Sequence, residues 1–468
     1  MNPSLDVAGL AALIDAFAAE RQCPSISWGV VADGVLVAHG ASGTLDSGAA
    51  PTERTAYRIA SMTKSFTCAA ALSLRDRGVF ALTDPIAAIV PELASVVAPT
   101  SDAPPVTVGH LMSMSSGLAT DDPWADRHLD ISIDDLFTTV APGMVFASAP
   151  GTAFEYSSTG FGLLGRVIER ASGRRVQDII SADFLAPLGM TATTWVQPNH
   201  DDWARPYRVV DGTIVADGLA PIGDGEIAPM GGLWTTVADL TRWVTFFDDA
   251  FPARDDPDTG PLRRASRREM QAMHTYASMR TLAGRSGATG YGYGLLVRDD
   301  PTLGRVVAHA GGLPGYGTNM RWLPGRRIGV IALANVTYAP MSELSTRMLD
   351  HLHAAGAVPA ETVPVSPLLR DLAQRLVALL GAWNESAAHD LFTDNVVLDE
   401  SFKRRAAAGQ ALREACGGTL EVVDVVATTA AAGTVSVAHP SGNPRRISFE
   451  VSPLLPPRIQ LYTIAEPA

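Results

Sequence analysis

The feature that most constrains this fold is the wide separation of its strand-like segments along the chain. Residues 25–43 read as two β-rich runs joined by Ala32-Asp33-Gly34, and Asp-Gly between apolar runs is a strong hairpin signal. Strand-like runs return much later, at residues 291–298, 304–312 and 326–336. The pattern therefore predicts a sheet built from segments that lie far apart in the sequence, with helices between them.

Helical patterns occupy the interval between these strands. Residues 5–21 carry apolar side chains at helical spacing, which predicts an amphipathic helix. From Ser61 to Arg77 apolar residues cover nearly all faces until Gly78 interrupts the pattern, as expected of a helix buried in the core. Between about 80 and 215 helical segments alternate with Pro and Gly breaks, so we expect an all-helical insertion there.

A proline-rich stretch marks a domain boundary. Residues 355–367 show little periodicity, so we place a first domain at 1–358, a linker at 359–367 and a second domain at 368–468. The second domain begins with leucines at helical spacing and continues with four short strand-like runs, which predicts a small α+β domain. The expected fold class of the whole chain is α/β, of the α+β kind.

Composition excludes several classes of protein. Hydrophobic residues make up 47% and charged residues 18% of the 468 residues, which fits a globular chain. The net charge of -13 opposes the phosphate neutralisation that nucleic-acid binding requires. No apolar run is long enough to span a bilayer, and the N-terminus lacks signal-peptide features. We therefore expect a cytoplasmic protein with no membrane or nucleic-acid partner.

The sequence also lacks the usual signatures of metal and disulfide chemistry. Cys23, Cys68 and Cys416 lie far apart and have neither the pairing pattern of a disulfide framework nor metal-site spacing. A His-Glu-x-x-His motif and a Gly-x-Ser-x-Gly elbow are both absent. We expect neither a metal nor a cofactor.

The first candidate cluster is Ser61-Met62-Thr63-Lys64, at the start of the buried helix. Residues three apart share a helical face, so the ammonium of Lys64 can reach the hydroxyl of Ser61. A lysine enclosed by apolar neighbours has its charged form disfavoured and can take the serine proton. The motif alone also fits a capping serine with an exposed lysine, but the apolar residues that follow favour burial.

Two further clusters lie later in the chain. Tyr156, close to Ser158 and just before a helix, suggests a phenol that carries protons, with Ser158 orienting the substrate. His309 ends a strand beside Gly311 and Gly312, whose small size lets a substrate backbone approach and frees the Gly312 N–H to bind an oxyanion. Each cluster taken alone also fits a structural role.

In this order the three clusters resemble the penicillin-binding-protein and class C β-lactamase superfamily. Three more stretches agree with the resemblance: Leu82–Pro85, Leu111–Leu118 and Gly231–Thr236. The likeness spans about residues 8–355 and implies an antiparallel sheet flanked by helices, a mostly helical subdomain beside it, and an active site in the cleft between them.

The resemblance also implies roles for these residues. Ser61 becomes the acyl-accepting nucleophile, Lys64 its base partner and Tyr156 the proton shuttle, while the N–H groups of Ser61 and Gly312 form the oxyanion hole. Position in the sequence, apart from the resemblance, adds two aromatic candidates. Tyr316, shortly after His309, is a candidate for the acyl pocket, and the turn Asp121-Asp122-Pro123-Trp124 places Trp124 at the cleft rim or in packing.

Two positions depart from the β-lactamase pattern. His309 stands where β-lactamases usually have Lys, and Ser158 stands where Asn is common. The His form is frequent among related esterases and D-amino-acid peptidases. A His with an ordinary pKa of about 6.5 is largely neutral at about pH 8, so it attracts a substrate carboxylate weakly.

The resulting hypothesis is a serine hydrolase that forms an acyl-enzyme on Ser61 and hydrolyses an ester or amide in a small-molecule or peptide substrate. One alternative passes the acyl group to an amine, as penicillin-binding-protein-type thioesterases do when they cyclise peptides. Another is a catalytically inactive binding module of the same fold. The sequence leaves the oligomeric state and the role of the C-terminal domain open.

Overall fold

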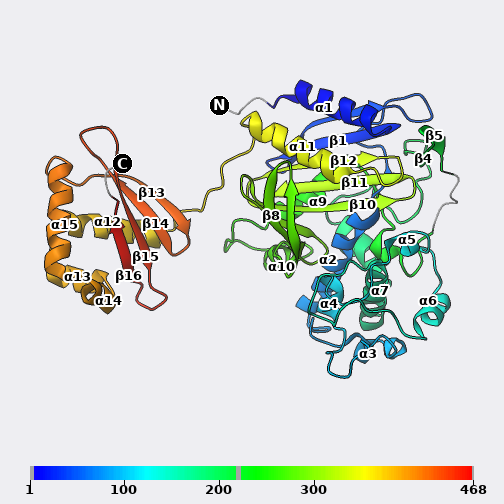
Figure 1. Cartoon of the computed structure of the whole chain (residues 1–468), viewed down its shortest axis with the longest axis horizontal. Coiled ribbons are helices and arrows are strands. Elements are labelled where there is room, and N and C mark those ends of the chain that lie inside the picture. The colour runs from blue at the N-terminus through cyan, green and yellow to red at the C-terminus, as the bar shows by residue number, and fades with distance from the viewer. Residues whose placement is uncertain (1–4, 218–222, 466–468) are drawn as a thin grey trace. The chain divides into compact units, whose positions relative to one another are not determined.

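The hairpin expected around Asp33-Gly34 is present in the computed structural model, which describes residues 5–217 and 223–465 (Figure 1). Strands β1 (Ser25–Ala32) and β2 (Val35–Gly43) flank a turn in which Asp33 and Gly34 have φ values of 50° and 81°. Left-handed values at both turn residues match the twist of the strands. The Asp-Gly prediction is confirmed.

The strands that are distant in sequence meet in one antiparallel sheet of eight strands among the described residues. Strand β1 pairs with β12 and not with its nearer neighbours in sequence, so the N-terminal hairpin completes a sheet made mostly of late segments. The sheet order is β2-β1-β12-β11-β10-β9-β8-β7. The late strands are β7 (Thr275–Leu282), β8 (Arg285–Tyr291), β9 (Leu296–Asp300), β10 (Gly304–Leu313), β11 (Tyr316–Leu323) and β12 (Ile328–Ala334).

Two differences from the expected strands concern the far edge of this sheet. Strands β7 and the start of β8 were not predicted, because small and polar residues obscure their alternation. The run 291–298 is also not one strand, because Gly294 takes a φ of 68° and separates β8 from β9.

Helices cover both faces of the sheet. Helices α1 (Val7–Glu20) and α11 (Met341–Ala354) share one hydrophobic core with one face. Helices α9 (Val237–Asp248) and α2 (Thr63–Asp76) belong to the core of the other face, which continues into the helical region. Figure 1 shows α11 over β11 and β12, with α2 at the opposite side of the strands. The buried helix predicted from residue 61 is therefore present and ends before Gly78.

The interval between about 80 and 215 is mainly helical. Its last part forms a β-hairpin instead of a helix. Asp211 and Gly212, with φ of 50° and 75°, form another Asp-Gly turn there, between the strands at 207–210 and 213–216. The elements are α3 (Ile86–Ile89), η2 (Pro91–Leu93), α4 (Val108–Met112), α5 (Asp122–Ala125), α6 (Ile133–Val140), α7 (Ser158–Ser172), α8 (Val176–Ile179), η3 (Ile180–Leu185), β4 (Tyr207–Val210) and β5 (Thr213–Ala216). Helix α10 (Arg264–Met270) follows α9.

The chain divides into two compact units, residues 1–360 and 361–468. The second unit has its own hydrophobic core and a four-stranded antiparallel sheet in the order β13-β14-β15-β16. Its elements are α12 (Pro367–Gly381), α13 (Glu385–Leu391), α14 (Asp394–Asp399), α15 (Phe402–Ala415), β13 (Val422–Thr429), β14 (Ala432–Val437), β15 (Arg445–Val451) and β16 (Ile459–Ile464).

The predicted fold class is confirmed: an antiparallel sheet flanked by helices, with a helical region and a small α+β unit. Within residues 5–217 and 223–465, none of the helices combines the length and apolar character that crossing a bilayer demands.

Candidate active site

Ser61 lies in a short helical turn, η1 (Ala60–Met62), that leads into α2. The preceding residue, Ala60, has a φ of 48°, a left-handed value that is costly for a residue with a Cβ. Two contacts hold this segment: the Ile59 N–H donates to the Leu233 carbonyl at 3.0 Å, and Thr318 Oγ1 donates to the Ile59 carbonyl at 3.0 Å. The serine is thus fixed by a strained turn that the surrounding strands support.

Lys64 lies directly behind the nucleophile. Its Nζ donates to Ser61 Oγ at 2.9 Å, to Ser158 Oγ at 3.1 Å and to the Met230 carbonyl at 3.1 Å. The side chain is fully buried, and burial lowers the pKa of Lys64 to about 8, although Asp122 and Asp126 act in the opposite direction. A neutral Lys64 is therefore accessible near neutral pH, as a base for Ser61 requires.

Ser158 connects Lys64 to a carboxylate. Its hydroxyl accepts from Lys64 and donates to Asp122 Oδ1 at 2.6 Å. The neighbouring Asp121 accepts the backbone N–H groups of Ser158 and Thr159 at 2.7 and 2.8 Å, which anchors the start of α7. Ser158 is fully buried and does not line the cavity at Ser61, so the prediction that it orients the substrate is replaced by a role within the lysine network.

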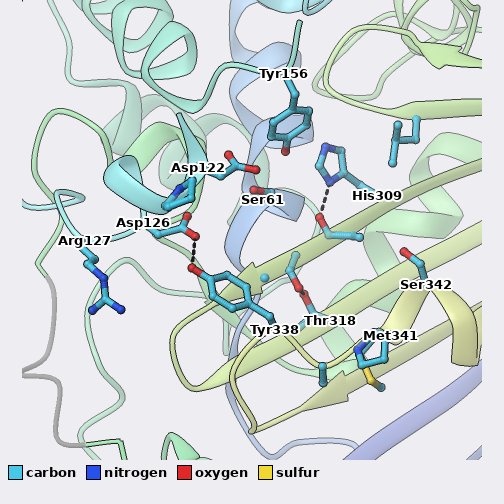
Figure 2. A pocket seen from close by; sticks show the side chains of 17 residues that line it. Ser61, Asp122, Asp126, Arg127, Tyr156, His309, Thr318, Tyr338, Met341 and Ser342 are labelled. Atoms are coloured by element: carbon cyan, nitrogen blue, oxygen red, sulfur yellow. Dashed lines mark hydrogen bonds between the residues drawn. The ribbon is translucent and has the colours of Figure 1, made fainter. Parts of the chain in front are cut away.

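Tyr156 approaches the nucleophile from the other side. Its side chain hydrogen bonds to Ser61, and Lys64 Nζ lies 4.9 Å from the centre of its ring. Burial, followed by the charge of Asp122, raises the pKa of Tyr156 well above its usual value, so the phenol carries its proton. In Figure 2 the Tyr156 hydroxyl points toward Ser61, which suits a group that relays protons.

His309 is held neutral by its surroundings. Its Nδ1 lies 2.6 Å from the Ala310 carbonyl, which can only accept, so Nδ1 carries the proton and donates. Its Nε2 then accepts from the Tyr291 hydroxyl at 2.8 Å. Burial, and then the charge of Lys64, lowers the pKa of His309 to about 3, far below the 6.5 assumed from sequence. The expected neutrality of His309 is reinforced by a partner, Tyr291, that the sequence did not identify.

These residues border a cavity of about 550 Å³. Ser61, Tyr156, His309, Gly311 and Gly312 all line it, so the structure brings together most of the predicted site. Figure 2 shows Ser61 between Tyr156 and His309 on one side and Asp122 on the other.

Gly311 is required by the close approach of two chain segments. A Cβ at Gly311 would lie 2.0 Å from the Ile59 carbonyl oxygen and 2.4 Å from Thr318 Oγ1. The strand β10 can therefore lie against the nucleophile segment only because this position has no side chain. The sequence predicted a small residue here to leave room for a substrate backbone. The structure adds a second reason, the close packing of β10 against Ile59.

A second carboxylate closes the cavity opposite His309. Asp126 is buried and accepts a hydrogen bond from the Tyr338 hydroxyl at 2.8 Å. Burial raises the pKa of Asp126 to about 6; the bond from Tyr338 opposes this rise, and the nearby Asp122 adds to it. This wall of the cavity thus carries two carboxylates, with the guanidinium of Arg127 beside them (Figure 2).

Two predicted residues lie outside both the cavity and the hydrogen-bond network of Lys64. Tyr316 faces a separate hollow with Trp203 and Trp234, and its hydroxyl donates to the Ala204 carbonyl at 2.9 Å, so its proposed place in the acyl pocket was wrong. Trp124 stacks on His128 with ring centres 4.4 Å apart and does not line the cavity, which leaves packing as its role.

Sequence reasoning missed Asp122, Asp126, Thr318, Tyr291 and Tyr338. The segment Asp121-Asp122-Pro123 was considered as a rim turn, and its acidic residues were the available signal. Thr318, Tyr291 and Tyr338 carry no local pattern, because their roles depend on strand pairing and on contacts across the cavity.

Comparisons with known proteins agree with this geometry. The Beta-lactamase family model matches residues 10–355. The esterase EstB of Burkholderia gladioli is 29% identical over 402 residues, covering 75% of this chain and 97% of the esterase. The D-alanyl-D-alanine-carboxypeptidase/endopeptidase AmpH of Escherichia coli K12 is 27% identical over 292 residues, covering 61% of this chain and 71% of AmpH.

A solved structure extends the likeness to nearly the whole chain. The octameric penicillin-binding protein homologue from Pyrococcus abyssi has a TM-score of 0.64 at 22% identity, covering 96% of this chain and 92% of its own. Because the first unit ends at residue 360 of 468, this likeness of fold includes the second unit. The family model covers most of the chain, and the protein therefore belongs to the Beta-lactamase family, within the serine β-lactamase and penicillin-binding-protein superfamily.

Proposed function

We propose that this protein hydrolyses an ester or amide through an acyl-enzyme on Ser61, with esters as its preferred substrates. The observation that carries the proposal is the 2.9 Å contact between Lys64 Nζ and Ser61 Oγ beside an open cavity. The named activities of EstB and AmpH, an esterase and a carboxypeptidase/endopeptidase, support this range of substrates.

The acylation step follows from the contacts around Ser61. Neutral Lys64 accepts the Ser61 proton as Oγ attacks the substrate carbonyl, and the carbonyl oxygen becomes an oxyanion bound by the N–H groups of Ser61 and Gly312. When the intermediate collapses, the bond to the leaving group breaks. Tyr156 donates its proton to the departing oxygen or nitrogen and regains one from protonated Lys64.

Deacylation uses the same groups with water in place of Ser61. A water molecule attacks the acyl carbonyl and gives its proton to the Tyr156–Lys64 pair, which returns a proton to Ser61 Oγ as the ester bond breaks. The acid product leaves, and the enzyme regains its starting protonation state. If an amine replaces water, the product is an amide, so analysis of products formed with an amine present separates hydrolysis from acyl transfer.

Preference for esters over β-lactams rests on His309. A lysine at this position would carry a charge that attracts the carboxylate of a β-lactam, whereas buried His309 is neutral and its Nε2 accepts from Tyr291. The cavity also carries the carboxylates of Asp122 and Asp126, which offset the exposed guanidinium of Arg127 in the same lining. An anionic group next to the scissile carbonyl therefore gains little attraction there.

The test is covalent labelling with a fluorophosphonate, followed by turnover of short acyl esters, D-residue amides and a chromogenic cephalosporin. Ser61→Ala should abolish labelling and lower ester turnover by at least about a thousandfold, since only the nucleophile is lost. Ser73→Ala, on the same helix but away from the cavity, is the matched control and should label normally.

Retained labelling of Ser61→Ala would place the nucleophile elsewhere. An unmodified protein that neither labels nor turns over any of these substrates would support the alternative of an inactive binding module.

A further inference from the structure

A second cavity, of about 460 Å³, lies on the α11 side of the sheet and is lined by arginines. Strand residues that point to this side, with side chains from α11, form its walls. The charged residues of the lining are Arg280, Arg298, Arg321, Arg347 and Glu343. Four arginines and one glutamate in one hollow contrast with the net charge of -13 of the whole chain.

Arg321 is the central group of this arginine cavity. Its side chain is buried, with 7% of the residue exposed, yet it forms no ion pair with a carboxylate within residues 5–217 and 223–465. Nε donates to Ser345 Oγ at 3.2 Å and Nη2 to the Ser342 carbonyl at 3.4 Å, whereas Nη1 has no partner in the described part of the chain. Burying a guanidinium with an unpaired N–H group costs free energy, and an anion bound beside it would offset that cost.

The other charges are arranged so that they do not neutralise Arg321. Glu343 is engaged by Arg21 at 2.9 Å and by Arg347. Arg298 pairs with Asp300 at 3.5 Å and donates to the Arg280 and Arg285 carbonyls at 2.8 and 2.6 Å.

Two more charged groups near the cavity also leave Arg321 without a carboxylate partner. Asp350 forms an ion pair with Arg285 at 2.6 Å and not with Arg321. The exposed side chain of Arg280, at the cavity mouth, has no hydrogen-bond or carboxylate partner in the described ranges. Burial and then the charge of Arg298 lower the pKa of Arg321 to about 10, while the charges of Asp350 and Asp300 act in the opposite direction, so Arg321 stays charged at neutral pH.

This cavity adjoins the catalytic one. Leu296, Pro340 and Ser342 line both, so the two cavities share a wall and lie next to each other. The catalytic end carries the carboxylates of Asp122 and Asp126 with a single exposed guanidinium, that of Arg127, while the far end carries the free guanidinium N–H of Arg321. The charge distribution orients a ligand that has an uncharged ester at one end and a negative group at the other.

We propose that the arginine cavity binds a carboxylate at the distal end of the acyl substrate, with Arg321 as its principal partner. This proposal rests on the proposed function and names the substrate class: acyl esters or amides of long dicarboxylic acids or related chains that end in a carboxylate. The planar carboxylate matches the fork of a guanidinium, which favours it over other anions.

The test compares mono-p-nitrophenyl esters of succinate, adipate and suberate with the same esters whose free carboxylate is capped as a methyl ester. The free acid should be favoured by at least about tenfold in kcat/KM for the longest chain, mainly through KM, and not for the shortest chain. Arg321→Gln should reduce this preference at least about fivefold while leaving kcat/KM for the capped esters within about twofold.

Two further variants keep the test decisive. Arg280→Gln removes a charge at the exposed mouth without touching the core, and should weaken the preference by about twofold or more. Arg305→Gln removes an exposed arginine on β10 outside the cavity and should leave the preference unchanged. Circular dichroism and melting temperature report whether Arg321→Gln is folded.

Direct binding separates this proposal from the proposed function. Suberate, which contains no ester, should bind the unmodified protein in isothermal titration calorimetry and bind Arg321→Gln at least about fivefold more weakly. Arg321-dependent binding of suberate without ester turnover would support the cavity and overturn the hydrolase. Equal turnover of free and capped esters at every chain length, or suberate binding that is as tight in Arg321→Gln as in the unmodified protein, would overturn the arginine cavity.

Discussion

The Tyr291 hydroxyl donates a hydrogen bond to His309 Nε2 at 2.8 Å, at the edge of the cavity that holds Ser61. The Ala310 carbonyl fixes the tautomer, because it can only accept from Nδ1, and Nε2 is then left to accept from Tyr291. A tyrosine on β8 therefore occupies the acceptor nitrogen of the imidazole. The pair presents a neutral wall where a lysine would present a positive charge.

This arrangement predicts the ratio of ester to cephalosporin turnover. We expect kcat/KM for a short acyl ester to exceed that for a chromogenic cephalosporin by at least about a hundredfold, which equals about 2.7 kcal/mol in the transition state. His309→Lys should narrow the gap, because the new ammonium attracts the cephalosporin carboxylate. His309→Gln, which stays uncharged, is the control and should not narrow it. Comparable turnover of both substrates by the unmodified enzyme would make β-lactamase the better assignment.

A second prediction concerns the pH dependence of acylation. Burial lowers the pKa of Lys64 to about 8, and only neutral Lys64 can accept the Ser61 proton. The value of kcat/KM for an ester should therefore rise with pH and reach half its maximum near that pKa. His309, whose pKa is lowered to about 3, should add no ionisation in the neutral range.

Initial rates measured between about pH 5.5 and 9.5, corrected for spontaneous hydrolysis, give this profile. A midpoint of this profile close to the ordinary histidine pKa of about 6.5 would indicate a different base.

The role of Tyr156 as a proton carrier gives a separate prediction. Tyr156→Phe should lower kcat far more than it changes KM, because the phenol acts on proton transfer in the transition state.

Sequence patterns predicted those parts of the fold and site that depend on neighbours in the chain. The hairpin at Asp33-Gly34 and the buried helix after Ser61 follow from local turn chemistry and from the run of apolar residues. Lys64 lies one helical turn after Ser61, so this spacing, together with the apolar residues that follow, predicted their contact. Tyr156 and His309 were found only through the order of motifs along the chain.

The missed features depend on contacts between distant segments. Asp122 meets Ser158 across the cavity wall, 36 positions apart in sequence, and no local pattern links them. Tyr316 was placed by its closeness in sequence to His309, but the turn between β10 and β11 directs its ring toward Trp234. Small residues also concealed β7, since Ala, Ser and Thr alternate too weakly to mark a strand.

Another prediction tests the close approach at Gly311. Gly311→Ala should displace the nucleophile segment, because the added Cβ would lie 2.0 Å from the Ile59 carbonyl oxygen. We expect a melting temperature lower by several degrees and fluorophosphonate labelling slowed by at least about tenfold. Gly381→Ala is the control, since its Cβ would meet nothing nearer than 3.9 Å. Normal labelling kinetics in Gly311→Ala would show that β10 does not constrain Ser61 in this way.

The last prediction concerns Asp126, whose pKa is raised to about 6 by burial and whose Oδ2 accepts from the Tyr338 hydroxyl. Between its ordinary pKa of about 3.9 and this raised value, the folded state binds more protons than the unfolded state. The free energy of unfolding must then fall as pH rises through that window, so ionised Asp126 destabilises the fold at neutral pH.

Asp126→Asn removes this charge and keeps an oxygen for Tyr338. It should stabilise the protein at about pH 7.5, by roughly 1–3 kcal/mol, and have little effect at about pH 4.5. Urea unfolding at the two pH values measures the difference, with exposed Asp130→Asn as the matched control. A stabilisation equal at both pH values would contradict the linkage. The linkage requires a larger effect where Asp126 is ionised than where it is protonated, since only the ionised form is destabilised by burial. The expected pattern would show that the carboxylate of Asp126 is kept in the cavity lining at the expense of stability, as groups placed for binding or catalysis often are.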